Sequence, residues 1–66
     1  MLSQKPKDIL NRYNILLTKI DECSSFEAID EALVNINLFN ELYKDNELYF
    51  LLLVSLKNKK VKLVKN

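Results

Sequence analysis

A chain of 66 residues can form one domain, and a domain this short buries only about 60% of the surface that its unfolded form exposes. With one cysteine and no histidine, the chain can form neither an internal disulfide nor a tetrahedral zinc site, so a partner chain is the remaining source of added stability. The hydrophobic share of 48% excludes a disordered chain, and the net charge of +1 divides into −4 for residues 1–56 (five basic and nine acidic side chains) and +5 for residues 57–66 (five lysines and no acid).

The first predicted helix runs from about Ser3 or Pro6 to Glu22. Proline is tolerated in a first helical turn, where its missing N–H would have no partner. Apolar residues then recur at steps of four, three, four and three, which is the spacing of one helical face: Ile9, Tyr13, Leu16, Ile20 and Cys23. Leu10 and Leu17 broaden this stripe on one flank, and only Ile15 is an apolar residue in the wrong place. The pattern predicts an amphipathic helix with the Cys23 thiol packed in the core.

A second helix is predicted to begin at the segment Ser24-Ser25-Phe26-Glu27, which has the pattern of a capping box. In that motif the Ser24 hydroxyl accepts from the Glu27 N–H, and the Glu27 carboxylate accepts from the Ser24 N–H. The predicted core stripe of this helix has Phe39 at its edge and otherwise comprises Phe26, Ile29, Ala32 or Leu33, Ile36 and Tyr43.

The second half of this helix carries another apolar stripe, Val34, Leu38 and Leu42, roughly opposite the first. Asparagines fill the gaps between these residues, and Asn is a mediocre helix former. Either the helix continues and is apolar on two sides, or it breaks near residues 35–37. The second stripe is the candidate partner interface. The alternative is that it packs inside the monomer, with the second helix between the other two.

Asp45 or Asn46 is the predicted cap of a third element that begins at Glu47. From Leu48 to Leu56 this element is apolar on all sides, which predicts a helix buried all round, and Asn58 is its predicted end. The expected fold is therefore all-α. A helical hairpin and a third, strongly apolar helix form an interaction domain over residues 1–58, followed by a basic tail over residues 59–66.

The tail suggests a second architecture, because Lys60, Val61, Lys62 and Leu63 alternate as residues of a strand do. In that case Leu48–Leu56 and Val61–Val64 form a β-hairpin after the helices, the order of a winged-helix domain. The candidate contacts with nucleic acid or with an acidic partner are Lys57, Lys59, Lys60 and Lys62. Lysine supplies charge without the bidentate reading of bases that Arg offers, so we expect such binding to be weakly sequence-specific.

The sequence lacks the residues on which catalysis usually depends. Without histidine there is no common general base, and without glycine there is no phosphate-binding loop of the P-loop or dinucleotide type. We expect no enzymatic activity, cofactor, metal or small-molecule substrate. The apolar run from Leu48 to Leu56 is about half of the roughly 20 residues that span a bilayer, so no membrane span is expected.

These observations predict a non-enzymatic protein–protein interaction module. It would form a homodimer, or act as a small accessory subunit of a larger complex, through Val34, Leu38 and Leu42. The alternative function is a small DNA- or RNA-binding regulator that uses the Lys-rich C-terminal segment. A lone cysteine suits a reducing compartment, so we expect a cytoplasmic protein, or one of the host cytoplasm or nucleus if the chain is viral.

Overall fold

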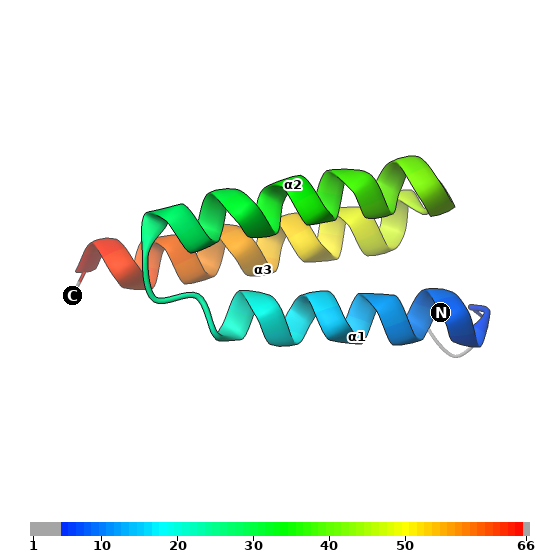
Figure 1. Cartoon of the computed structure of the whole chain (residues 1–66), viewed down its shortest axis with the longest axis horizontal. Coiled ribbons are helices and arrows are strands. Elements are labelled where there is room, and N and C mark those ends of the chain that lie inside the picture. Colours follow the sequence, from blue (N-terminus) through cyan, green and yellow to red (C-terminus); the bar gives the residue numbers. More distant parts are fainter. Residues whose placement is uncertain (1–4, 66) are drawn as a thin grey trace.

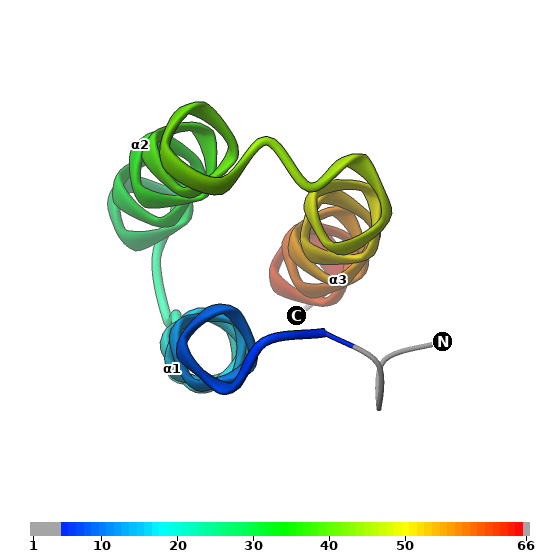
Figure 2. The same ribbon diagram turned by 90° about the vertical axis from the view of Figure 1, so that its right-hand side faces the viewer.

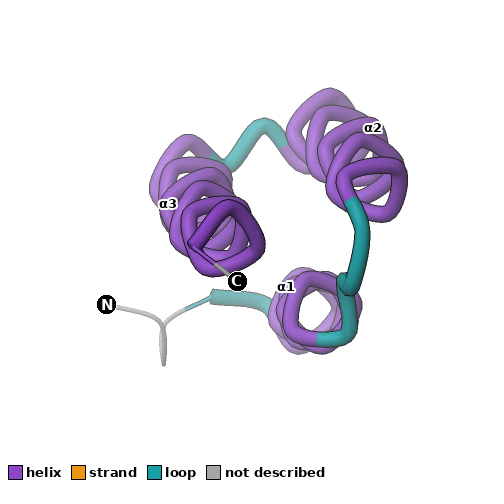
Figure 3. Tube along the Cα trace, turned by 90° about the vertical axis from the view of Figure 1, so that its left-hand side faces the viewer, coloured by secondary structure: helices purple, strands orange, loops and turns teal. Residues whose placement is uncertain are grey.

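The computed structural model describes residues 5–65, and over this range the chain forms three α-helices that run up, down and up along a bundle (Figure 1). They are α1 (Lys7–Asp21), α2 (Phe26–Tyr43) and α3 (Asn46–Lys65). Viewed along the bundle, the helices surround one core, and each of them contacts the other two (Figures 2 and 3). The end of α1, the start of α2 and the end of α3 share one end of the bundle. An all-α unit of three helices, as predicted, is what these residues form.

Helix α1 begins directly after Pro6, whose carbonyl accepts from the Leu10 N–H at 3.1 Å. Ser3, the other predicted start, lies outside the described residues. The helix ends at Asp21, and the predicted stripe forms its inner face, with Tyr13, Leu16 and Ile20 buried. Cys23 is buried beyond the end of the helix, as predicted.

The cap of helix α2 lies one residue later in the chain than predicted. The Ser25 hydroxyl, and not that of Ser24, accepts from the backbone N–H of Ala28 at 3.2 Å. Ser25 has the extended backbone of a helix cap, so Glu27 stands one position too early to return the hydrogen bond. The predicted pairing of Ser24 with Glu27 is therefore wrong.

Helix α2 is continuous through residues 35–37, so the predicted alternative of a break there is wrong. Its buried residues are Ile29, Ala32, Ile36 and Phe39. Phe39 therefore lies inside the core and not at its edge. Phe26, predicted as a core residue, is 51% exposed because it is the first residue of the helix and has no preceding turn to cover it.

Helix α3 is capped as predicted by Asp45, whose Oδ1 accepts from the Leu48 N–H at 3.0 Å. Leu48, Leu52 and Leu56 are buried, but Phe50 is 64% exposed and Val54 is also exposed. The expectation that this segment is buried on all sides is not confirmed. Between the buried leucines, Tyr49, Leu51 and Leu53 are partly buried against the core, and only Phe50 and Val54 face outward.

Beyond Leu56, α3 continues to Lys65, so the predicted end at Asn58 is wrong and a separate basic tail is not confirmed. No part of residues 5–65 is a strand, which also rules out the predicted C-terminal β-hairpin in this range. The physical reason is the spacing Leu56, Lys59, Leu63, which continues the inner face of the helix. Leu63 packs against the core, and Lys59 Nζ donates to the Asp21 carbonyl oxygen at the end of α1 at 2.8 Å.

Candidate functional site

The predicted interface residues lie on the outer side of α2. Val34 is 58% exposed, Leu38 is 56% exposed and Leu42 is 71% exposed, so none of them packs inside the monomer. A step of four residues turns a helix by about 40° beyond a full turn, so the stripe drifts around α2. It drifts toward α1, and Leu38 and Leu42 reach the groove between the two helices.

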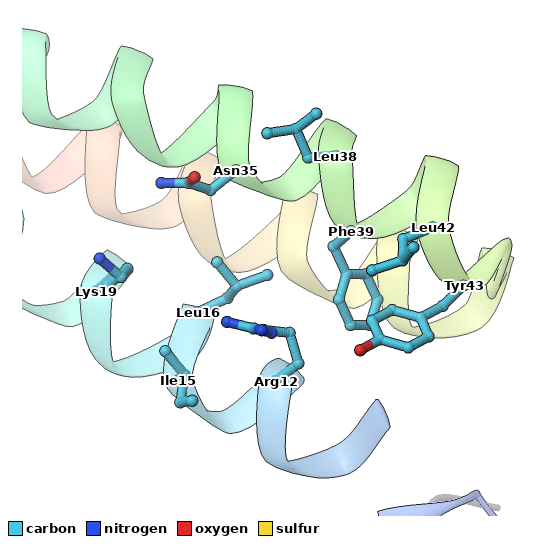
Figure 4. Close-up of a pocket in the computed structure, with 9 residues that line it drawn as sticks. All are labelled: Arg12, Ile15, Leu16, Lys19, Asn35, Leu38, Phe39, Leu42 and Tyr43. Carbon is cyan, nitrogen blue, oxygen red and sulfur yellow. The ribbon is translucent and has the colours of Figure 1, made fainter. Parts of the chain in front are cut away.

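This groove has a volume of about 310 Å³, and α1 and α2 form its two sides (Figure 4). The α1 side brings a fourth exposed aliphatic residue to the surface, Ile15, which is 47% exposed. The residues that line the groove are Arg12, Ile15, Leu16, Lys19, Asn35, Leu38, Phe39, Leu42 and Tyr43. The sequence offered a signal for Ile15, because it is the one apolar residue outside the predicted stripe of the first helix.

The floor of the groove belongs to the core. Leu16 and Phe39 are buried, and Tyr43 is half-buried. The rings of Phe39 and Tyr43 lie with their centroids 5.0 Å apart at an interplanar angle of 53°, a tilted contact of the kind that aromatic pairs favour. A floor that is packed into the core holds its shape, so the groove is preformed.

Charged residues on the two helices that form this surface have opposite signs. On α1, Arg12 and Lys19 stand on either side of Ile15 in the sequence at spacings of three and four, and both line the groove. On α2, Glu31 lies three residues before Val34 and Glu27 lies four residues before Glu31, so both extend the stripe toward the start of the helix. Within residues 5–65 the only ion pairs are those of Lys5 with Asp45 and Glu47, so all four charges are without an ion-pair partner. We name this surface the α1–α2 face: Arg12, Ile15, Lys19, Glu27, Glu31, Val34, Leu38 and Leu42.

The four candidate lysines do not share one surface. Lys59 and Lys62 line a shallow hollow beside Leu17 and Asp21 of α1. A spacing of three places Lys57 and Lys60 together on another side of α3. Because Lys59 Nζ is bound to the Asp21 carbonyl oxygen, its charge is directed toward the end of α1. The structure therefore divides this group into two pairs.

Cys23 is held as a packed thiol. Its Sγ donates to the Lys19 carbonyl oxygen at 3.3 Å, and burial raises the pKa of the thiol. A raised pKa keeps the group in the weakly nucleophilic SH form at neutral pH.

Among residues 5–65, no three His, Cys, Asp or Glu side chains gather closely enough to hold a metal ion. Within the same range, no helix has the length and apolarity needed to cross a membrane.

No family model, curated protein or solved structure shows a significant match to this chain.

Proposed function

We propose that the chain is a non-enzymatic interaction module whose α1–α2 face binds another protein chain, in the first place a second copy of itself. The observation that carries the proposal is the exposure of Ile15, Val34, Leu38 and Leu42 around a preformed groove. Monomers rarely expose large aliphatic side chains side by side, and such patches mark interaction sites. The alternative to self-association is that the module is an accessory subunit, in which case a larger protein covers the α1–α2 face.

The energy of covering this face favours a symmetric dimer. Full burial of one such side chain contributes roughly 1.5–3 kcal/mol. About half of each of the four is exposed, so covering them contributes roughly 3–6 kcal/mol per copy. A two-fold interface uses the face twice and gains roughly 6–12 kcal/mol, against an association cost of roughly 4–15 kcal/mol. The gain is of the size that a dimer needs, whereas one face against a poor surface falls short.

The proposal is tested by the double substitution Leu38→Gln and Leu42→Gln. Gln is a good helix former, and both positions are exposed, so the monomer keeps its fold. In a two-fold dimer the change removes four buried leucines, worth roughly 4–8 kcal/mol, which weakens the dimer at least about a thousandfold. Sedimentation velocity of both chains over a range of concentrations measures the difference.

Phe50→Gln is the matched control, because Phe50 is equally large, apolar and exposed but lies on α3, outside the α1–α2 face. It leaves the dimer intact. A double variant that dimerises as tightly as the unaltered chain, or a Phe50 variant that is weakened to the same degree, contradicts the assignment of this face. A chain that is monomeric at every concentration contradicts self-association and leaves the accessory-subunit arrangement.

The second candidate function is binding of DNA or RNA phosphates by the lysines of α3, which is supported by the absence of any acid after Glu47. If Lys57 and Lys60, which share one side of α3, contact duplex phosphates, affinity falls roughly 12-fold between 50 and 200 mM salt. An electrophoretic shift assay at the two salt concentrations measures this, with Lys57→Gln/Lys60→Gln as the weakened variant. Absence of binding at the lower concentration contradicts this function.

A further inference from the structure

We propose that the outer side of α3 binds an anionic lipid surface, with a row of apolar side chains entering the interface and lysines meeting the headgroups. The row, which we name the α3 ridge, consists of Phe50, Val54, Lys57, Val61 and Val64. It shares no residue with the α1–α2 face. The inference therefore goes beyond the function proposed above and does not depend on it.

The spacing of the α3 ridge places its residues on one side of the helix. They recur at steps of four, three, four and three, so they fall within an arc of about 80° around α3. The buried Leu48, Leu52 and Leu56 lie nearly opposite, on the side where the other two helices pack (Figure 2). The four apolar members of the ridge are between 39% and 67% exposed. Such an aligned row, about 21 Å long, is a surface for contact with a partner.

The charges around the α3 ridge are basic. Lys57 lies within the ridge, and Lys60 and Lys65 stand on its two sides, all three of them exposed. No acid follows Glu47 in the sequence, and among residues 5–65 the ion pairs involve no lysine other than Lys5. The two other lysines of this stretch are directed toward α1, where both line the shallow hollow described above. The ridge thus combines an exposed apolar row with three unpaired positive charges.

An anionic lipid surface matches both features at once. Apolar side chains enter the boundary between headgroups and acyl chains, while a lysine beside them keeps its ammonium group among the headgroups at the end of a long apolar stem. Lysine binds as a point charge, and a fluid layer of anionic headgroups demands no fixed geometry from it.

Other partners match only part of the α3 ridge. A nucleic acid neutralises the lysines through its phosphates but leaves Phe50 and the three valines in water. A second copy of α3 sets lysine against lysine, which opposes association. A protein packed on the ridge buries the Lys57 ammonium at its centre and must place an acid against it. A lipid surface leaves that ammonium among polar groups.

A tryptophan reporter tests whether the α3 ridge enters the lipid. The chain has no tryptophan, so Phe50→Trp carries a single one, and Leu42→Trp is the matched control because Leu42 is also large, apolar and exposed but lies on α2. The vesicles contain about two phosphatidylcholine molecules to one phosphatidylserine, with brominated acyl chains that quench an inserted indole. We expect vesicles to shift the emission of Phe50→Trp to the blue and to quench it, and to leave Leu42→Trp unquenched.

Co-sedimentation with the same vesicles, without bromine and with lipid in excess, measures the contribution of each part of the ridge. Lys57→Gln loses about fivefold in affinity, the effect of one lysine at an anionic surface, and Phe50→Gln loses at least as much. Lys7→Gln, the same change of charge on α1, loses less than about twofold. Vesicles of phosphatidylcholine alone bind the unaltered chain about a hundredfold more weakly, because three lysines lose their partners. Far-UV circular dichroism verifies that each variant is folded.

Three results would each overturn the proposal. The first is a Phe50→Trp chain that is unquenched, or a Leu42→Trp chain that is quenched equally. The second is vesicle binding that survives Phe50→Gln unchanged, because charge alone then holds the chain at the surface. The third is binding of duplex DNA without binding of anionic vesicles, which assigns the lysines to nucleic acid. None of these results bears on the α1–α2 face, whose test is the oligomeric state of the chain.

Discussion

At the scale of single residues, Asp45 joins two parts of the fold. Its carboxylate caps α3 through the Leu48 N–H and also accepts from Lys5 Nζ at 2.8 Å, while Lys5 reaches Glu47 Oε1 at 3.1 Å. The Lys5 ammonium, followed by the Leu48 N–H, lowers the pKa of Asp45 below its ordinary 3.8, and Asp45, followed by Glu47, raises the pKa of Lys5 above 10.5. One carboxylate thus holds the segment before α1 against the start of α3.

The lowered pKa of Asp45 predicts a loss of stability in acid. Because the unfolded chain takes up a proton at this group more readily, the contribution of the carboxylate is complete above about pH 4. It is lost as the pH falls through the folded-state pKa. In Asp45→Asn the amide still caps the helix but does not titrate. The free energy of unfolding in urea, measured at pH 5 and pH 3 at one chain concentration, should fall more for the unaltered chain than for the variant. Equal falls would contradict this role of Asp45.

At the scale of elements, the turn between α2 and α3 contains the one residue of the described range with positive φ, Lys44 at φ 52° and ψ 40°. The left-handed conformation costs a residue with a side chain about 1–2 kcal/mol, and glycine adopts it freely. After the greater entropy of glycine in the unfolded chain is subtracted, Lys44→Gly should be more stable than Lys44→Ala by about 0.5–1 kcal/mol. Urea unfolding of the two variants measures the difference, and an alanine variant as stable as the glycine variant would contradict the prediction.

The ends of the helices show what local sequence can and cannot predict. The cap of α3 was predicted to within two neighbouring residues, Asp45 or Asn46, because only one short polar segment separates the second and third apolar stretches, and the structure selects Asp45. Ser24 and Ser25 are adjacent and chemically equivalent, so the choice between them depends on how the chain leaves α1. The predicted end of α3 at Asn58 is wrong. Basic and apolar residues alternate over Lys60–Leu63, and this local pattern is typical of a strand. The helical conformation of this segment depends on contacts of Lys59 and Leu63 with residues far away in the sequence.

At the scale of the whole molecule, the all-α architecture could be predicted because the inner stripes of α1 and α2 are clear in the sequence. The exposed stripe Val34, Leu38 and Leu42 was found by the same periodicity. The groove was not, since it requires Ile15 of α1 to lie beside α2, and only the packing of the two helices determines that. The charges of the α1–α2 face likewise belong to two stretches that are unrelated in the sequence.

The account depends most on one property of the unaltered chain: its face of Ile15, Val34, Leu38 and Leu42 is covered by a second copy in solution. Sedimentation equilibrium from about 1 to 200 μM, a range that brackets dimers of modest affinity, measures this directly. The account predicts a molar mass that rises with concentration and levels off at twice the mass of one chain. A mass that stays at one chain throughout, with the helical circular dichroism of the folded bundle, would contradict it.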